Sequence, residues 1–478
     1  MIKVKEEIIK IAGKENVAGD EATLKSYSSD FSLQPAKNPM LVVRPKDRDE
    51  VVKIVKVANE HMIPLVPVSS KVHFHGEAIP EQGGIIVDLT RMDKVLQVDA
   101  RNRKVKIEPG VTWGKLQEAL NEHGQMALRP FFPHPFKSAL TSSLEREPML
   151  IPKYEYADPV LTMEVVLPTG DIFKTGTASA AKTEEAYPEG PGIDFFRFFQ
   201  GAQGTMGIVT WLNIKTEYLP KHQKPFFIPF NTIGEVVEPL YRLQRRHIGN
   251  ECFVLNRTNL ATLLAEDFSK EYEKLKAVLP PYTVILLIAG APRRPLERIA
   301  YEEEALHEIA SELLFEPQKT VGGIAGLGET MIQLLGSAQR EDNYWKTRHK
   351  GSTQDIFFLT TLDKVSDYQK LVFQKAIDHG YSTEAIGMYL QPLERGRACH
   401  LEFSFPCDLA SPKEKDQVKG LFTELSGGLI NAGAFFSRPY GPWADMVYRR
   451  STVYTNTLKE LKKIFDPRNI LNPGKLCF

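Results

Sequence analysis

Residues 63–77 read Ile-Pro-Leu-Val-Pro-Val-Ser-Ser-Lys-Val-His-Phe-His-Gly-Glu, an apolar segment that runs directly into a polar loop. A second apolar segment, Ile85-Ile86-Val87-Asp88-Leu89, follows soon after. Short apolar runs bounded by glycine and proline are typical of strands. A tight loop after a strand can point backbone N–H groups at an anion, and Ser69, Ser70 and Lys71 add further donors. Such a loop standing alone is more often a surface turn.

Two more turns share this character. Residues 108–113, Glu-Pro-Gly-Val-Thr-Trp, form a strand-to-helix turn in which Gly110 can take backbone angles that other residues avoid. Residues 201–210, Gly-Ala-Gln-Gly-Thr-Met-Gly-Ile-Val-Thr, carry glycines three residues apart, which let the backbone approach a ligand closely before a strand begins. A lone glycine triplet is more often a packing turn. The three turns together indicate a site for an anionic cofactor.

The segments around these turns predict an α+β nucleotide-binding domain followed by a second sheet. Asp47-Arg48-Asp49-Glu50 is a capping-box start for a helix with an apolar face from Val51 to Ala58. From about residue 224, two strand-helix-strand units suggest a second sheet covered by helices. A last helix at 453–465 precedes a tail that we expect to pack on the first domain. In the first 220 residues we expect strands at 65–68, 85–89, 95–99, 105–108 and 208–214, a helix at 113–123 and a hairpin at 168–171.

Length, charge and cysteine content narrow the class of protein. At 478 residues the chain exceeds one hydrophobic core, so two or more domains are expected. Sixty basic and 60 acidic residues leave no net charge, which argues against a nucleic-acid surface. The charged N-terminal stretch and short apolar runs predict a cytoplasmic protein without a membrane span. Four scattered cysteines argue against a disulfide framework and against a cysteine-ligated metal or iron–sulfur centre.

In order and separation, these segments resemble the FAD-binding domain of the vanillyl-alcohol oxidase and p-cresol methylhydroxylase (PCMH) flavoprotein superfamily. The spacing is most similar to the glycolate oxidase and D-lactate dehydrogenase FAD subunits. The resemblance implies an α+β fold with a two-subdomain PCMH-type FAD-binding domain at 1–217, an α/β ferredoxin-like substrate (cap) domain at 218–440, and a C-terminal segment at 441–478 that packs on the FAD domain. It is carried by the loop at 68–76, Val43-Arg44-Pro45, IIVDLTRM, KVKIEPGVTW, LTMEVVLPTGDIFKTG, GAQGTMGIVT and the closing DPRNILNPGK.

The resemblance implies FAD as the cofactor, although the cradle departs from the family pattern. The family loop is glycine-rich, whereas serine, lysine and valine occupy most of those positions here, and a Gly-Gly pair is replaced at 140–143. We expect side-chain donors to rebuild the cradle; weaker FAD binding is the alternative. A histidine of the loop is a hypothetical point of covalent flavin attachment, or it only packs near the cofactor. The expected FAD contacts are Ser69, Ser70, Lys71, Val72, His73, His75, Pro133, Ser142, Gly204, Gly207 and Ile208, with attachment through His73 or His75.

Residues in the second half supply the candidates for substrate chemistry. The segment at 344–349 resembles a Trp-x-x-Arg motif whose arginine binds a substrate carboxylate, which makes Arg348 a candidate; an interdomain ion pair is the alternative. His400 falls where metal-dependent hydroxy-acid dehydrogenases carry two histidines, but the earlier position is Leu393 and the later Glu-His-Gly signature is absent. A divalent ion held by His400 and Glu402 would lack ligands, so no catalytic metal is predicted.

The run at 434–443, Ala-Phe-Phe-Ser-Arg-Pro-Tyr-Gly-Pro-Trp, is similar to the aromatic segment of the aryl-alcohol branch. Aromatic walls around one arginine suit a flat or carboxylated substrate, with Arg438 compensating negative charge and Tyr440 or His400 accepting a proton. An aromatic cluster that belongs only to the core is the alternative.

The leading hypothesis is an FAD-dependent dehydrogenase or oxidase that takes hydride from a CH–OH group of a hydroxy-acid or aryl-alcohol substrate. Because the chain lacks cysteines for its own relay, electrons would pass to oxygen, a quinone, a separate iron–sulfur subunit or another acceptor subunit. Two alternatives stay open: an FAD-fold subunit with a binding or scaffolding role in a larger redox complex, and a flavin-dependent reductase. A homodimer is one assembly open to the chain.

Overall fold

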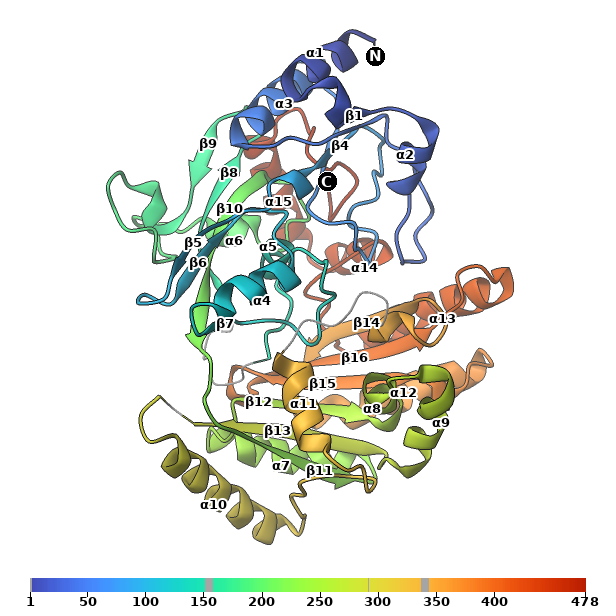
Figure 1. The fold of residues 1–478 in the computed structure, drawn as a ribbon. Helices are drawn as coiled ribbons and strands as arrows, with labels where there is room; N and C mark the ends of the chain where they lie inside the picture. The colour runs from blue at the N-terminus through green and yellow to red at the C-terminus, as the bar shows by residue number, and fades with distance from the viewer. Residues whose placement is uncertain (1, 151–157, 291, 337–343) are drawn as a thin grey trace.

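The computed structural model describes residues 2–150, 158–290, 292–336 and 344–478, and it arranges them around three β-sheets (Figure 1). The first sheet has the order β1-β2-β4-β3, in which β4 pairs in parallel with both β2 and β3. Helices α1 and α3 bury their apolar sides against one face of this sheet. The elements are α1 (Ile2–Ala12), β1 (Val17–Ala18), α2 (Glu21–Ser26), β2 (Leu41–Val43), α3 (Arg48–His61), β3 (Leu65–Val68) and β4 (Ile85–Asp88).

Helix α3 begins as its sequence predicts. The Asp47 carboxylate accepts a hydrogen bond from the Glu50 backbone N–H at 2.9 Å, and the Glu50 carboxylate accepts one from the Lys46 N–H. Helix α1 was not predicted, yet its buried residues Val4 and Ile8 stand at helical spacing. That pattern was available in the sequence.

The second sheet has the order β5-β6-β10-β8-β9, with β7 beside the end of β10. Strand β10 runs to Tyr218, four residues beyond the predicted end, because Thr216 to Tyr218 pair with β7. The elements are β5 (Val95–Asp99), β6 (Lys104–Ile107), α4 (Trp113–Asn121), β7 (Gln125–Ala127), α5 (Ala139–Leu144), β8 (Val160–Val166), β9 (Ile172–Lys174), α6 (Phe196–Phe199) and β10 (Ile208–Tyr218). The first two sheets and their helices form the first module.

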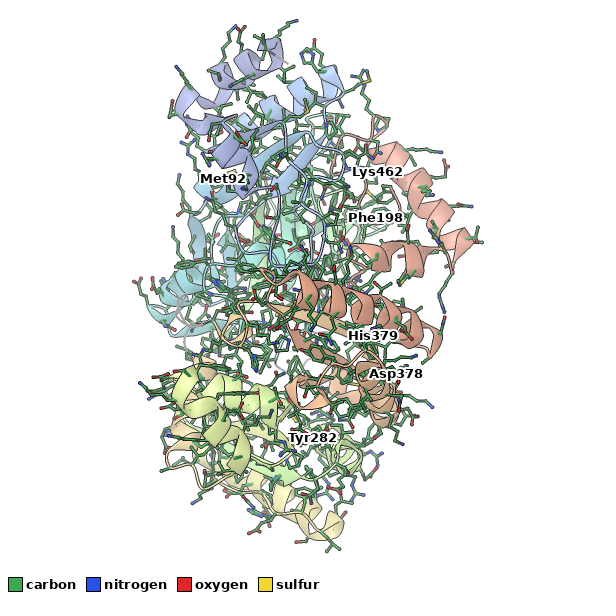
Figure 2. The ribbon with its side chains drawn as sticks, turned by 90° about the vertical axis from the view of Figure 1, so that its right-hand side faces the viewer. Met92, Phe198, Tyr282, Asp378, His379 and Lys462 are labelled. Atoms are coloured by element: carbon green, nitrogen blue, oxygen red, sulfur yellow. The ribbon has the colours of Figure 1, made fainter. Side chains whose placement is uncertain are left out.

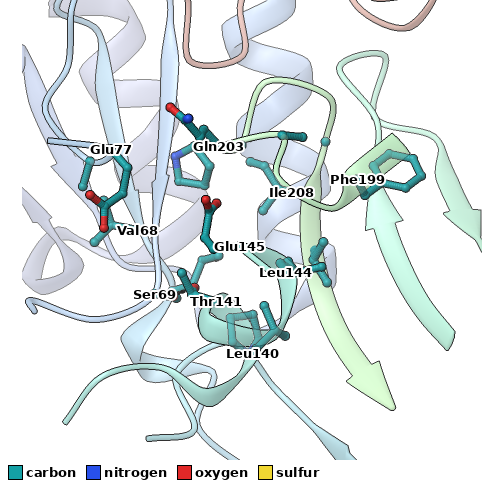
Figure 3. Close-up of a pocket in the computed structure, with 18 of the residues that line it drawn as sticks. Val68, Ser69, Glu77, Leu140, Thr141, Leu144, Glu145, Phe199, Gln203 and Ile208 are labelled. Carbon is teal, nitrogen blue, oxygen red and sulfur yellow. Dashed lines mark hydrogen bonds between the residues drawn. The ribbon is translucent and has the colours of Figure 1, made fainter. Parts of the chain in front are cut away.

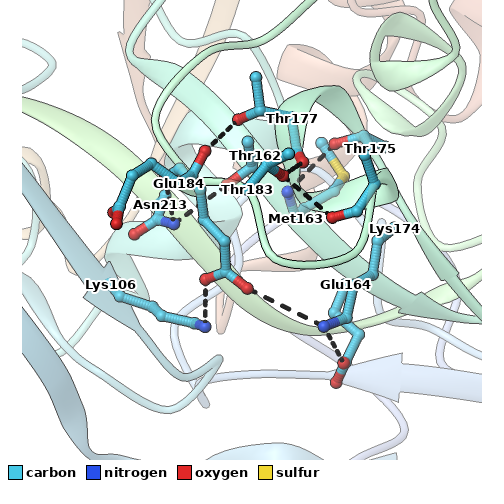
Figure 4. Close-up of polar contacts among 12 residues, drawn as sticks. Lys106, Thr162, Met163, Glu164, Lys174, Thr175, Thr177, Thr183, Glu184 and Asn213 are labelled. Carbon is cyan, nitrogen blue, oxygen red and sulfur yellow. Dashed lines mark hydrogen bonds and ion pairs between the residues drawn. The ribbon is translucent and has the colours of Figure 1, made fainter. Parts of the chain in front are cut away.

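Polar side chains tie the segment after β9 to the second sheet (Figure 4). The Asn213 side chain on β10 donates to the Thr162 hydroxyl at 3.0 Å and to the Glu185 carbonyl at 2.9 Å. The Lys106 ammonium lies 2.6 Å from the Glu185 carboxylate. These contacts hold the segment over the sheet whose strand β10 begins at the candidate site.

The third sheet and its helices form the second module. Its six strands are antiparallel in the order β11-β13-β12-β15-β16-β14, so the two predicted strand-helix-strand units join in one sheet. Helix α7 begins at Ile233, where Thr232 and Glu235 form a capping box. The strands are β11 (Gln223–Phe230), β12 (Glu251–Asn256), β13 (Tyr282–Ala289), β14 (Thr353–Thr360), β15 (Gly387–Leu393) and β16 (Ala398–Pro406).

Helices cover the two faces of this sheet unequally. One face packs against α7, α10, α12 and α13, and the other packs against α8, α9 and α11. Figure 1 shows β14 and β16 nearest to the first module and β11 farthest from it. The helices are α7 (Ile233–Arg245), α8 (Arg257–Leu264), α9 (Phe268–Val278), α10 (Pro295–Leu313), α11 (Leu327–Gly336), α12 (Val365–Asp378) and α13 (Pro412–Asn431).

The chain finally returns to the first module through α14 (Pro442–Tyr448) and α15 (Thr452–Phe465). Beyond α15, Leu471 lies beside Leu65 of β3, whose N–H donates to the Ile470 carbonyl at 2.7 Å. Within the described ranges, no helix combines the length and the apolar character needed to cross a bilayer.

Candidate active site

The first cavity lies inside the first module (Figure 3). The end of β3, the loop that follows it, helix α5 and the turn before β10 surround it. Its wall is mostly apolar, with several hydroxyl and carboxyl groups. The main lining residues are Pro67, Val68, Ser69, His73, Glu77, Pro109, Leu140, Thr141, Leu144, Glu145, Phe199, Gln203, Gly204, Gly207 and Ile208.

The loop after β3 is held by its own side chains. The His73 ring lies 3.0 Å from the Glu77 carboxylate through Nδ1 and 2.6 Å from the Ser70 carbonyl through Nε2. Burial opposes both charges, but the hydrogen bond between them raises the pKa of His73 and lowers the pKa of Glu77. The two groups therefore form a buried ion pair. Among the described residues, the buried Ser70 hydroxyl has no hydrogen-bond partner.

Glu145 brings a second carboxyl group to the first cavity. It is 8% exposed, and its Oε2 accepts a hydrogen bond from the Tyr440 hydroxyl at 2.6 Å. Burial raises the pKa of Glu145 to about 7. Near neutral pH this carboxyl group is therefore protonated in a large fraction of molecules.

These residues fit the nucleotide part of the FAD that the sequence predicts. A Cβ on Gly204 would lie 2.5 Å from Pro67 Cγ, and one on Gly207 would lie 2.2 Å from Val165, so only glycine lets this turn approach the cavity. The Ser69 and Thr141 hydroxyls contact each other in the cavity wall, which leaves one hydroxyl hydrogen to donate to a ligand. Pairing of Glu77 with His73 and protonation of Glu145 remove much of the repulsion that a diphosphate would meet.

The second cavity lies between the loop after β3 and the part of the third sheet formed by β14, β15 and β16. Strand alternation builds its floor: Asp355 and Phe357 on β14 point to the same face as His400 and Glu402 on β16. Phe357 and Glu402 are direct cross-strand partners. The lining residues are Phe74, His75, Pro130, Phe131, Pro133, His134, Lys137, Glu147, Pro148, Tyr344, Lys346, Asp355, Phe357, Tyr389, His400, Glu402 and Arg438.

A charged array occupies this floor. The Lys346 ammonium lies 2.5 Å from Asp355 Oδ2 and 2.7 Å from Glu402 Oε1, and His400 Nε2 lies 3.4 Å from Glu402 Oε2. Burial raises the pKa of Asp355 to about 6. Burial disfavours the charged forms of Lys346 and Glu402 too, but their mutual attraction raises the pKa of Lys346 and lowers that of Glu402. Within the described chain, Asp355 Oδ1 has no hydrogen-bond partner.

Arg438 is a further buried cation of the second cavity, and it stands outside this charged array. The residue is 6% exposed, and its guanidinium lies 4.1 Å from the centre of the Phe357 ring. Lys137 and Lys346 each contact a carboxylate, whereas within the described ranges no hydrogen bond or ion pair engages the Arg438 guanidinium. The cavity therefore offers an anion a buried positive charge.

Aromatic rings form the remaining walls. Phe131 stacks on Tyr389 with 4.2 Å between ring centres, and His75 stacks on Tyr440 at 4.9 Å. Burial lowers the pKa of His75 and of His134 to about 4, so both imidazoles are neutral at physiological pH. The second cavity can thus hold a flat ligand beside one cation.

Two family models match parts of the chain. The model of the FAD binding domain matches residues 39–176, and the model of the C-terminal domain of FAD-linked oxidases matches residues 444–476. Glycolate oxidase subunit GlcD of Bacillus subtilis (strain 168) is 25% identical over 483 residues, which cover 99% of this chain and 96% of the relative. The chain is thus an FAD-linked oxidoreductase with a PCMH-type fold.

Other relatives agree with this assignment. The 4-cresol dehydrogenase (hydroxylating) flavoprotein subunit of Pseudomonas putida is 23% identical and covers 97% of this oxidoreductase and 93% of its own length. A crystal structure of p-cresol methylhydroxylase with substrate bound has a TM-score of 0.86 at 19% identity, covering 100% of this chain and 96% of that one. The predicted α+β PCMH-type fold, the FAD cofactor and the enzyme class are confirmed.

Seven of the eleven predicted FAD contacts of the oxidoreductase line one of the two cavities. Ser69, His73, Gly204, Gly207 and Ile208 line the first cavity, and His75 and Pro133 line the second.

Four predicted contacts line neither cavity. Ser70 and Val72 are buried, Lys71 is exposed with its ammonium 5.7 Å from the Tyr27 ring centre, and Ser142 accepts a hydrogen bond from the Trp113 indole at 3.1 Å. The role of each residue toward FAD stays a prediction.

The four predicted catalytic residues also separate. His400 and Arg438 line the second cavity, and Tyr440 lies between the cavities, bonded to Glu145. Arg348 lies outside both linings and donates to the carbonyls of Thr262, at 3.0 Å, and Ala265. Within the described ranges, no cluster of three or more His, Cys, Asp or Glu side chains could hold a metal ion.

Sequence reasoning missed Lys346, Asp355 and Glu145. Lys346 stands in the same segment as Arg348, and alternation along 353–358 places Asp355 with Phe357. These two sequence features are weak evidence. The pairing of Lys346 with residues of β14 and β16 depends on the tertiary fold, so the sequence could not predict it.

Proposed function

We propose that this oxidoreductase takes hydride from a CH–OH group of a flat substrate that also carries an anionic group, such as a hydroxy acid or an acidic aryl alcohol. The observation that carries the proposal is Arg438, a buried guanidinium in the second cavity that forms no ion pair or hydrogen bond within the described chain. A planar guanidinium can bind a carboxylate through two parallel hydrogen bonds. In this proposal the FAD-binding domain covers 1–217 and the substrate domain covers 218–440.

Phe357 fixes where that anion would bind. The ring lies under the guanidinium at 4.1 Å and holds it in the cavity, so the substrate pays little to order the arginine. Phe131, Tyr344 and Tyr389 extend the aromatic wall for a flat substrate. The names of the relatives support both substrate types, since they include a glycolate oxidase, a D-lactate dehydrogenase and a cresol dehydrogenase.

His400 is the better of the two proton acceptors. Burial lowers the pKa of His400, so its ring is neutral and can accept the hydroxyl proton. Glu402 lies 3.4 Å away and would stabilise the imidazolium that forms. Tyr440 is less suitable, because burial and Glu145 raise the pKa of its hydroxyl well above 10. Asp355 Oδ1 is placed to accept a hydrogen bond from a substrate hydroxyl.

Residues of both cavities would hold FAD. The turn at 204–208, the loop at 67–73 and helix α5 would hold its nucleotide part, and the boundary formed by His75, Tyr440 and Glu145 would meet its ring. Bound FAD supplies the hydride acceptor. Electrons would then leave to oxygen, a quinone or a separate acceptor subunit; two relatives are themselves named as subunits.

Anaerobic reduction of the flavin, followed by absorbance, tests the proposal. The purified protein is mixed with a panel of 2-hydroxy acids and aryl alcohols, each acid paired with its uncharged ester or amide. Arg438→Met should lower the apparent second-order rate for the anionic substrate by about 30-fold or more, since a buried charge pair is truncated. Arg348→Met should change this rate little. Arg449→Met, at an exposed position on the surface, is the control for the loss of one positive charge. Equal losses with charged and uncharged substrates would contradict the assignment of Arg438.

A further inference from the structure

We infer that Lys462, Asn472 and Lys475, together the C-terminal clamp, are positioning residues that hold two loops at the edge of the first cavity and thereby set the affinity for FAD. The loops are residues 76–77, after β3, and residues 203–205, before β10. Both border the cavity, where Glu77 and Gln203 are lining residues (Figure 3). The three residues of the clamp line neither the first nor the second cavity.

Lys462 fixes the turn before β10. It lies on α15 beside the first module (Figure 2) and is 4% exposed. Its ammonium lies 2.6 Å from the Thr205 carbonyl, 2.6 Å from the Asp466 carboxylate and 3.0 Å from the Leu471 carbonyl. One buried cation thus joins α15, the tail and the turn that contains Gly204. A side chain without charge could not satisfy three acceptors from three segments.

Asn472 and Lys475 connect the same tail to both loops. The Asn472 amide donates to the Gln203 carbonyl at 2.7 Å and to the Glu77 carbonyl at 3.4 Å. The Lys475 ammonium donates to the Gly76 carbonyl at 2.7 Å and lies 3.0 Å from the Glu81 carboxylate. The bonds from Asn472 and Lys475 to the two loops go to backbone carbonyls, so they do not occupy the side chains of Glu77 and Gln203.

The loops have a conformation that needs such support. Gly76, Gln203 and Gly204 all have positive φ angles, of 79°, 50° and 71°. For Gln203 this region is unfavourable, and glycine in a loop has many alternatives. A clamp formed on folding orders both loops before FAD arrives, so binding does not have to supply that entropy. The backbone of the tail adds a further anchor, because the Asn472 N–H donates to the Leu65 carbonyl of β3.

Titration of the apoprotein with FAD, followed by quenching of flavin fluorescence, tests the clamp without any substrate. Lys462→Met and Lys475→Met should each weaken FAD binding about tenfold or more, because hydrogen bonds from charged groups to loop carbonyls are lost. Lys463→Met is the matched control on the same helix: the Lys463 side chain is 68% exposed, and its ammonium contacts exposed Glu460. This variant should bind FAD like the wild type.

Apoprotein melting temperatures separate positioning from general stability. The clamp predicts that FAD raises the melting temperature less in the two methionine variants than in the wild type. An unchanged dissociation constant in both variants would overturn the inference, as would an equal FAD-induced rise in melting temperature. If the lysine variants do not fold, Asn472→Ala decides: weaker FAD binding supports the clamp, and unchanged binding refutes it.

Discussion

Glu145→Gln tests whether a buried carboxyl group of the first cavity is protonated in the folded protein. Glu145 is 8% exposed, and burial raises its pKa from the usual value near 4.5 to about 7. Glutamine keeps the shape and can still accept the hydrogen bond of the Tyr440 hydroxyl. The substitution therefore removes the ionisation and preserves the contact.

The size of the effect follows from the pKa difference between the folded and unfolded chain. Below about pH 4.5 the Glu145 carboxyl is protonated in both states, so ionisation costs no stability. As the pH rises from about 4.5 to about 7, the unfolded chain releases the proton and the folded protein retains it, so the free energy of unfolding falls. Above pH 7 the loss reaches about 3 kcal/mol, since each pKa unit corresponds to about 1.4 kcal/mol. The Glu145→Gln variant has no ionisable group at this position, so its free energy of unfolding does not fall in this way.

Thermal unfolding at pH 5 and pH 8.5 measures the difference. For 478 residues melting as one unit the unfolding entropy is about 1 kcal/mol/K, so about 3 kcal/mol corresponds to about 3 °C. Glu145→Gln should gain this amount over the wild type between the two pH values. Glu118→Gln, at an exposed position on α4, controls for the loss of one charge. An equal difference between variant and wild type at both pH values would show that Glu145 ionises normally.

Three further predictions concern the second cavity and the cofactor. Lys346→Met leaves Asp355 and Glu402 buried without their cation and should destabilise the protein by about 3–5 kcal/mol at pH 8. The loss should be smaller at pH 5, because the pKa of Asp355 is raised to about 6; equal melting temperatures of variant and wild type at pH 8 would count against the array. The covalent hypothesis predicts that flavin stays with the acid-precipitated wild-type protein. His75→Ala should release the flavin, whereas His73→Ala should not, because the His73 ring contacts Glu77 and Ser70. Full release of flavin from the wild type would refute covalent attachment. Elemental analysis should find no stoichiometric metal, and one zinc per chain would refute that prediction.

Local sequence patterns sufficed for much of the fold. The capping box at Asp47 predicted the start of α3, and buried apolar runs predicted β3 and β4, because these elements depend on neighbouring residues. The end of β10 was not predictable, since residues 216–218 are extended by pairing with β7. Pairing partners that are distant in sequence decide such boundaries.

Residues of the candidate site were predictable where they belong to a recognisable sequence motif. They were not predictable where only the tertiary fold brings them to the site. Arg438 and His400 stand in recognisable segments and do line the second cavity. Arg348 stands in one too, but the carbonyls of Thr262 and Ala265, at the end of α8, engage its guanidinium. Helix α8 was not predicted, so these acceptors could not be anticipated. Lys346 faces Asp355 and Glu402 only because β14 and β16 pair in their observed register.

The visible absorption spectrum of the purified protein tests the central claim most directly. If residues of the first cavity hold FAD, the protein should be yellow with a bound-flavin spectrum and about one FAD per chain, or should acquire that spectrum when FAD is added. Glu77 and Glu145, both facing the cavity, are compatible with this result only if pairing and protonation neutralise them. A colourless protein that FAD cannot reconstitute would contradict the account.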